Sequence, residues 1–284
     1  MIVVTGATGQ LGRLVIQQLL RTQPASGVIA AVRNPAKAAD LAALGVQVRQ
    51  ADYDQPETLH NAFAGARRIL LISSSEVGAR ARQHQAVIDA AKHVGVDLLA
   101  YTSLLHADSS PLGLATEHRA TEAAILASGL PWVLLRNGWY TENYAQAIPA
   151  ALAHGALIGS AGAGRIASAA RADYAAAAAT AIGADGVQNR IYELAGDDGY
   201  TLAEFAAELS RQSGKSVPYV DMPEAEYRAA LVGAGLPAPI AAMLADSDAG
   251  AAQGALDDTD RQLSALIGRP TAPMATTIAA TLAS

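Results

Sequence analysis

The chain has 284 residues, 51% of them hydrophobic, with a formal net charge of −6 and no cysteine. This length suits one large α/β domain or a cofactor-binding domain with a smaller lobe, and the apolar content excludes an extensively disordered chain. The lack of cysteine excludes disulfides, thiolate nucleophiles and cysteine-ligated metals. The negative charge argues against a nucleic-acid partner, and no apolar run is long enough to predict a membrane span. Because the chain opens on a run typical of a core strand rather than a signal peptide, we expect a cytoplasmic protein.

The first twelve residues combine a short apolar strand with a glycine-rich turn. The β-branched run 2–4 predicts a buried strand, and apolar residues from Leu11 to Leu20 then recur with helical period. Glycine suits an unusual backbone angle at Gly6, close approach to a pyrophosphate at Gly9, and close packing of helix on strand at Gly12. The start of a helix offers unpaired N–H groups to such an anion. We therefore predict a dinucleotide site formed by Gly6, Ala7, Thr8, Gly9, Gln10, Leu11 and Gly12.

Strands and helices alternate through the first half of the chain. The patterns predict strands at 28–33, 46–51, 68–72, 98–102 and 131–136, with helices at 34–44, 56–63, 79–94 and 116–128. Such alternation is typical of a doubly wound parallel sheet of the Rossmann type, which binds ligands beyond the carboxyl ends of its strands.

The second half is less regular and predicts a smaller, mostly helical lobe. We expect a helix ending at 149–154, a loop or hairpin at 155–164, a helix at 173–182 and a strand at 191–196. Thr201 and Glu204 form a capping-box pattern that opens a helix to Gly214, and further helices are expected at 224–231, 237–244 and 259–267. The predicted division is an NADP-binding domain at 1–136, to which 173–196 returns, and a substrate-side lobe at 137–172 and 197–284.

The residue after the second strand indicates which dinucleotide is preferred. NAD-binding folds usually place a carboxylate there, whereas this chain has Arg33, followed by Asn34 and Lys37. A guanidinium can bind a 2′-phosphate in bidentate fashion. We therefore predict NADPH as the cofactor; the alternative is an arginine at a sheet edge that simply faces solvent.

Two further loops follow predicted strands at the same edge. Asp52 and Tyr53 follow the third strand, where a carboxylate can accept a hydrogen bond from the adenine amino group. Ser73, Ser74 and Ser75 follow the fourth strand, beside the expected ribose and nicotinamide. Both sets are predicted to bind the cofactor, and both could equally be ordinary loop residues.

Several motifs together resemble a known family. They are the glycine turn and the segments 32–35, 51–53, 73–78, 101–107, 134–143 and 169–174. The chain resembles the NmrA-like branch of the atypical short-chain dehydrogenase/reductases, close to the bacterial zinc-independent NAD(P)H:quinone oxidoreductases. The resemblance implies that Asn137, Gly138, Trp139, Tyr140, Thr141 and Glu142 wrap the nicotinamide end of the cofactor, and that Arg171 reaches back to the site.

The residue types after the sixth strand are consistent with this implication. Asn137 offers amide hydrogen bonds, and Gly138 permits close backbone approach. Trp139, Tyr140 and Tyr144 provide flat surfaces for a planar substrate; the alternative is that these aromatic side chains form the core of the lobe.

The tyrosine–lysine pair that ordinary reductases of this superfamily use, four residues apart, is missing. Lys37, Lys92 and Lys215 are preceded at that spacing by Arg33, Ile88 and Arg211. Its absence argues against alcohol or simple ketone chemistry, which needs a positioned proton donor. A quinone instead accepts hydride to give a hydroquinone anion that water can protonate, so positioning suffices and neither metal nor flavin is expected.

Candidate catalytic helpers remain near the fifth strand. Ser103 follows that strand, His106 lies on the next loop, and His118 and Glu122 share a helix face at i, i+4. Ser103 and His118 are the catalytic candidates, although a lone histidine is more often structural. In many relatives a lysine stands where this chain has His118, which puts its acid role in doubt.

Two functions from different classes remain open. The first is NADPH-dependent reduction of small quinones, and the second is a redox-sensing regulator of the NmrA type that binds the dinucleotide without turnover. A sugar-nucleotide reductase or epimerase is a third, which the missing tyrosine–lysine pair disfavours. The sequence does not set the oligomeric state, and a homodimer is one expectation.

Overall fold

The computed structural model describes residues 1–284, which divide into two compact units. The first unit contains residues 1–107, 116–137 and 172–193, and the second contains residues 108–115, 138–171 and 194–284. No helix of either unit is both long and apolar enough to cross a bilayer.

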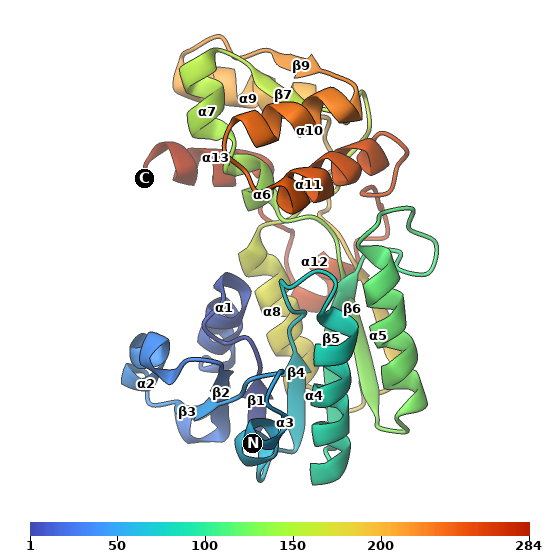
Figure 1. Cartoon of the computed structure of the whole chain (residues 1–284). Helices are drawn as coiled ribbons and strands as arrows, with labels where there is room; N and C mark the ends of the chain where they lie inside the picture. The colour runs from blue at the N-terminus through green and yellow to red at the C-terminus, as the bar shows by residue number, and fades with distance from the viewer. The chain divides into compact units, whose positions relative to one another are not determined.

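A seven-stranded sheet forms the centre of the first unit (Figure 1). Its strand order is β3 (Gln47–Gln50), β2 (Val28–Val32), β1 (Ile2–Val4), β4 (Arg68–Leu71), β5 (Leu98–Leu104), β6 (Trp132–Asn137) and β8 (Arg190–Leu194). All pairings from β3 to β6 are parallel. The strand order changes direction between β1 and β4, so the loops after these two strands diverge at the usual binding crevice of such folds. The predicted Rossmann-type fold is confirmed.

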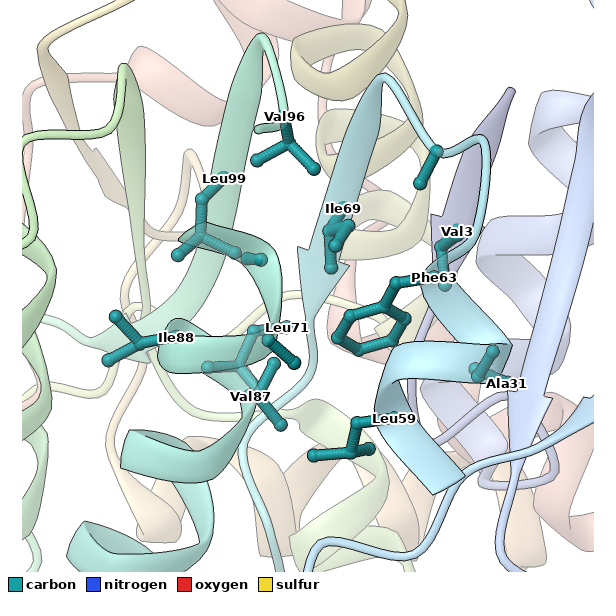
Figure 2. Close-up of a cluster of buried hydrophobic side chains, with 14 of the residues drawn as sticks. Val3, Ala31, Leu59, Phe63, Ile69, Leu71, Val87, Ile88, Val96 and Leu99 are labelled. Carbon is teal, nitrogen blue, oxygen red and sulfur yellow. The ribbon is translucent and has the colours of Figure 1, made fainter. Parts of the chain in front are cut away.

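Helices flank this sheet and bury one apolar face each. They are α1 (Gln10–Leu19), α2 (Ala39–Ala43), α3 (Pro56–Phe63), α4 (Arg80–Val94), α5 (Ala115–Ala127) and α8 (Arg171–Gly183), with short 3₁₀ turns η1 (Ala25–Gly27) and η2 (Pro35–Ala38). Figure 2 shows Phe63 of α3 and Ile88 of α4 packed over Ile69 and Leu71 of β4, within a fully buried cluster. Burial of such side chains contributes roughly 1.5–3 kcal/mol each, which fixes the strand ends that carry the site.

The second unit combines helices with a small two-stranded sheet. Its elements are α6 (Thr141–Ala145), α7 (Ile148–His154), β7 (Leu157–Gly159), α9 (Leu202–Ser213), β9 (Tyr219–Asp221), α10 (Glu224–Gly233), α11 (Ala238–Ala251), α12 (Gln262–Ile267) and α13 (Met274–Leu282). The predicted capping box is confirmed, because the Thr201 hydroxyl accepts from the Glu204 N–H while the Glu204 carboxylate accepts from the Thr201 N–H. β7 and β9 pair in parallel.

Several elements of the second unit differ from the expectation. The segment 155–164 is neither a simple loop nor a hairpin, because it contains the single strand β7, whose parallel partner β9 lies about sixty residues further along the chain. The helices α6 and α13 were not predicted, and α11 extends to Ala251 rather than ending at 244. α12 begins at Gln262 rather than 259, since Arg261 before it has a left-handed φ of 55°.

Candidate functional site

The glycine turn between β1 and α1 has the geometry that its sequence predicts. Gly6 has a positive φ of 57°, a conformation that side chains disfavour. A Cβ on Gly12 would lie 2.5 Å from the Gly6 carbonyl oxygen and 2.7 Å from the Ala7 Cα, so helix and turn touch through bare backbone. Gly9 differs from the expectation in one respect, because its N–H already donates to the Gly6 carbonyl at 2.9 Å.

The start of α1 retains the donors for an anion. Its N-cap is Gly9, no side chain caps the helix, and its first turn has no acidic residue. The N–H groups of Gln10 and Leu11 therefore have no acceptor within the helix, and they carry the positive end of its dipole. These features fit the pyrophosphate of a dinucleotide.

Arg33 follows β2 with its guanidinium mostly exposed. Its Nη1 donates to the Glu76 carboxylate at 2.7 Å, and that pairing raises the pKa of Arg33. Glu76 lies on the loop after β4, so the two loops meet at this edge of the sheet. The predicted arginine is thus in place, with a carboxylate partner that sequence reasoning missed.

The loop after β3 is held by its own hydrogen bonds. Asp52 accepts from the Asp54 N–H at 3.1 Å, which is a local turn contact. The Tyr53 hydroxyl donates to Thr5 Oγ1 at 2.7 Å, and burial raises the pKa of Tyr53 to about 12. The Tyr53 hydroxyl therefore joins the ends of β3 and β1, whereas the role of Asp52 toward an adenine stays a prediction.

The serine loop after β4 is fixed to α4 rather than free. The Ser74 N–H donates to His84 Nε2 at 2.9 Å, and its hydroxyl donates to Gln83 Oε1 at 2.6 Å. Because His84 Nε2 accepts, its Nδ1 carries the proton and donates to Thr121 at 2.9 Å. Burial lowers the pKa of His84 to about 4, so this imidazole is neutral. The Ser73 N–H donates to the Thr102 hydroxyl at 2.9 Å.

β5 and α5 are joined by two polar contacts, one above the other. Tyr101 bonds His118 Nδ1 at 2.8 Å, and Ser103 donates to Glu122 at 2.5 Å. The i, i+2 spacing on the strand matches the i, i+4 spacing on the helix. Burial lowers the pKa of His118 to about 3. Both catalytic candidates therefore lie at the contact between β5 and α5, and each has a partner within the first unit. Ser103 stands within β5 rather than after it, because the strand continues to Leu104.

A buried ion pair continues this polar row into β6. Arg136 bonds Glu122 in bidentate fashion, with Nε and Nη2 at 3.0 and 2.8 Å from the two carboxylate oxygens. Its Nη1 donates to Glu193 of β8 at 2.8 Å, and Glu193 also accepts from the His106 N–H at 2.8 Å. A charged residue at the end of an apolar strand run was the available signal for Arg136, but the sequence does not indicate its partners.

Asn137, the last residue of β6, has a buried side-chain oxygen that accepts no hydrogen bond. Its side-chain oxygen is buried and has no hydrogen-bond partner, while its carbonyl oxygen accepts from the Leu105 N–H at 2.9 Å. A buried acceptor without a donor is rare in a native protein and suits a ligand N–H group. The carboxamide of a nicotinamide has such a group.

In the second unit, the residues that follow Asn137 are bound to the segment 166–171. The Thr141 N–H donates to the Ala169 carbonyl at 3.0 Å, and the Glu142 carboxylate accepts from the Arg171 N–H at 2.9 and 3.0 Å. The Arg171 guanidinium lies 4.7 Å from the centre of the Tyr140 ring. Arg171 thus contacts Tyr140 and Glu142, while the role of these residues toward the nicotinamide stays a prediction.

Two aromatic residues that were predicted to face a planar substrate are buried. Trp139 and Tyr144 are both buried, and the Tyr144 hydroxyl donates to Asp248 at 3.1 Å. Tyr144 also packs against Phe205 within the second unit. For Tyr144 the alternative interpretation, a side chain of the lobe core, is the one the structure supports.

The sheet, the glycine turn and the arginine after β2 together define a dinucleotide-binding α/β protein. A family model described as NAD(P)H-binding matches residues 6–185. The chain belongs to this NAD(P)H-binding family.

Known relatives resemble the chain over almost its whole length. Quinone oxidoreductase 2 of Escherichia coli (strain K12) is 58% identical over 278 residues, covering 98% of this chain and 97% of that protein. A crystal structure of an NADPH-dependent quinone oxidoreductase from Escherichia coli complexed with NADPH has a TM-score of 0.97 at 57% identity, covering 99% of this chain and 100% of that one. The triphenylmethane reductase of Citrobacter sp., complexed with NADP(H), has a TM-score of 0.95 at 40% identity, covering 99% and 100% of the two chains.

A more distant structure shares the fold alone. NmrA, a negative transcriptional regulator in complex with NAD, is 16% identical with a TM-score of 0.77, covering 98% of this chain and 94% of that one. Taken together, these matches confirm the resemblance expected from the sequence.

Proposed function

We propose that this protein reduces small quinones to hydroquinones with NADPH, by direct two-electron transfer. The observation that carries the proposal is the 58% identity to quinone oxidoreductase 2 over 98% of the chain. The NADPH-complexed quinone oxidoreductase structure supports it, because its TM-score of 0.97 means that the two backbones nearly coincide.

The first unit provides the residues that would hold NADPH. The turn at Gly6, Gly9 and Gly12 admits the pyrophosphate to the start of α1, and Arg33 provides the cation for the 2′-phosphate. The buried Asn137 oxygen would accept from the carboxamide. For six residues of the second unit, a role at the nicotinamide end is proposed from the resemblance alone: Gly138, Trp139, Tyr140, Thr141, Glu142 and Arg171.

When bound, NADPH would supply the hydride, and the residues of the chain would hold the nicotinamide and the quinone in position. At neutral pH His118 is uncharged, because burial lowers its pKa to about 3, so it is a poor source of a proton. Ser103 donates its own proton to Glu122. An acceptor that becomes an aromatic hydroquinone needs no strong acid, and water can protonate it.

The direct test is NADPH oxidation, followed at 340 nm, with and without a simple benzoquinone. We expect enzyme-dependent loss of absorbance above the non-enzymatic rate, with NADPH preferred to NADH. Binding of NADPH without enzyme-dependent loss across several quinones would instead favour a sensing role.

The location and assembly of the protein stay predictions. We expect a cytoplasmic protein, and cell fractionation tests this. A homodimer is one expectation for the assembly, and light scattering of the purified protein tests it.

A further inference from the structure

Glu76 is paired with Arg33, the cation that we propose binds the 2′-phosphate of NADPH. Its Oε1 accepts from Arg33 Nη1 at 2.7 Å, although both side chains are largely exposed, 68% for Arg33 and 44% for Glu76. A surface pair of this kind is ordinarily weak and exchanges with water. Here, however, a second hydrogen bond fixes the Glu76 carboxylate through its other oxygen.

A buried amide holds Glu76 toward Arg33. The Gln83 side chain is 2% exposed, and its Nε2 donates to Glu76 Oε2 at 2.8 Å. Its Oε1 accepts from the Ser74 hydroxyl, which also accepts from the Glu76 N–H at 3.2 Å. Both the backbone and the carboxylate of Glu76 are therefore anchored to the loop and to α4.

The surrounding charges make this edge more acidic than Arg33 alone suggests. The carboxylates near Arg33 that raise its pKa are Glu76, then Asp52 and Asp54. Asp54 is itself paired with Arg82 at 2.7 Å. A 2′-phosphate, with about −1.5 to −2 charges, would be attracted by Arg33 and repelled mainly by Glu76, the carboxylate in contact with Arg33, whereas the 2′-hydroxyl of NADH can donate a hydrogen bond to a carboxylate.

We propose that Glu76 is a specificity-determining residue that competes with the 2′-phosphate for Arg33 and so limits the preference for NADPH over NADH. The proposal rests on the proposed function, since it takes Arg33 as the phosphate ligand. Glu76 follows β4, yet it acts as the carboxylate after β2 acts in NAD-binding folds.

The test is the dissociation constant of each coenzyme, measured by calorimetry at one fixed, low ionic strength, because salt weakens exposed charge interactions. Glu76→Gln removes the charge and keeps an amide that can bond Gln83. We expect its NADPH dissociation constant to fall roughly threefold to tenfold. The dissociation constant for NADH should stay the same or rise, because a neutral amide oxygen is a weaker acceptor for the 2′-hydroxyl than a carboxylate. Asp54→Asn is the control for a general charge effect, because Asp54 lies near Arg33 but is paired with Arg82 at 2.7 Å. Its contacts with Gln83 are long, at 3.3 and 3.5 Å, and an asparagine oxygen can still accept them, so a change below about twofold is expected.

Repeating the substitutions in a protein that lacks Arg33 separates competition for Arg33 from a general effect of removing a negative charge. In Arg33→Ala, Glu76→Gln should change NADPH binding no more than Asp54→Asn does. Weaker NADPH binding by Glu76→Gln, an unchanged NADPH/NADH ratio, or an equal gain from Asp54→Asn would each overturn the proposal. If the unsubstituted protein bound neither coenzyme, the proposed function itself would fail.

Discussion

At the scale of single residues, the preference for NADPH is predicted to depend on Arg33. Arg33→Asp replaces the proposed phosphate ligand with a group that repels phosphate and accepts from ribose hydroxyls, as in NAD-binding folds. We expect the NADPH/NADH affinity ratio to invert, measured by calorimetry. Arg21→Asp makes the same charge change at another exposed position of the first unit, and it should leave the ratio nearly unchanged. An unaltered ratio in Arg33→Asp would refute the assignment.

His118 tests whether the reaction needs a dedicated acid. Its ring is neutral and bonded to Tyr101, so His118→Ala should lower turnover only modestly. A thousandfold loss of turnover, about 4 kcal/mol, would show that His118 takes part in the chemistry. Turnover should be compared at saturating NADPH and quinone, on protein shown to be folded by circular dichroism.

The two buried histidines also predict how stability depends on pH. His84 and His118 have folded-state pKa values of about 4 and about 3, below the unfolded value, because burial disfavours their charged forms. Above pH ~6.5 both histidines make their full contribution to the free energy of unfolding. As the pH falls toward the folded-state pKa values, the unfolded chain binds protons that the folded chain does not, and by pH ~5 each histidine has lowered the free energy of unfolding by about 2 kcal/mol.

Urea unfolding at pH 7 and pH 5 measures this dependence. His118→Gln should reduce the loss of unfolding free energy between the two pH values by about 2 kcal/mol. A loss identical to that of the unsubstituted protein would contradict the burial argument.

At the scale of elements, the contact between the glycine turn and α1 decides whether the phosphate site exists. Gly12→Ala would place a Cβ 2.5 Å from the Gly6 carbonyl oxygen, so α1 must shift. We expect a loss of about 1–3 kcal/mol in unfolding free energy and a fall of at least roughly tenfold in NADPH affinity. Gly183→Ala, at the end of α8 with no atom near its added Cβ, is the control and should change neither quantity appreciably. Equal behaviour of the two variants would contradict the close approach.

The row of polar contacts between β5, α5 and β6 is a second element-scale feature. Glu122→Gln leaves Arg136 buried with half of its charge partners, so the free energy of unfolding should fall by about 3 kcal/mol. The double variant Glu122→Leu, Arg136→Met should lose less than Glu122→Gln alone, because the guanidinium and the carboxylate that binds it in bidentate fashion are removed together. Glu193, the second partner of Arg136, is 17% exposed and keeps its hydrogen bond from the His106 N–H. Chemical denaturation at pH 7 measures both, and a larger loss in the double variant would contradict the argument.

The elements of the first unit could be predicted because their patterns are local. Strands such as 68–71 are apolar on both faces, and helix starts such as Pro56 carry their own signals. The pairing of β7 with β9 could not be predicted, because two three-residue strands have no periodicity and their partnership depends on distant chain segments. In the site, glycine positions follow from backbone geometry, whereas the pairing of Arg33 with Glu76 depends on two loops meeting in space.

At the scale of the whole molecule, the chain is a sheet-based dinucleotide-binding unit joined to a second unit that carries the segment 138–171. The relatives that match nearly its full length include, by their names, a quinone oxidoreductase and a triphenylmethane reductase, two enzymes with different acceptors. These relatives can share one way of binding the coenzyme while other residues determine which acceptor each enzyme reduces.

Calorimetric titration of the purified protein with NADPH tests the central claim most directly. The account predicts one site per chain that is tighter for NADPH than for NADH and at least roughly tenfold weaker for NADPH in Gly12→Ala. No binding of either reduced or oxidised coenzyme, by heat or by NADPH fluorescence, would contradict it.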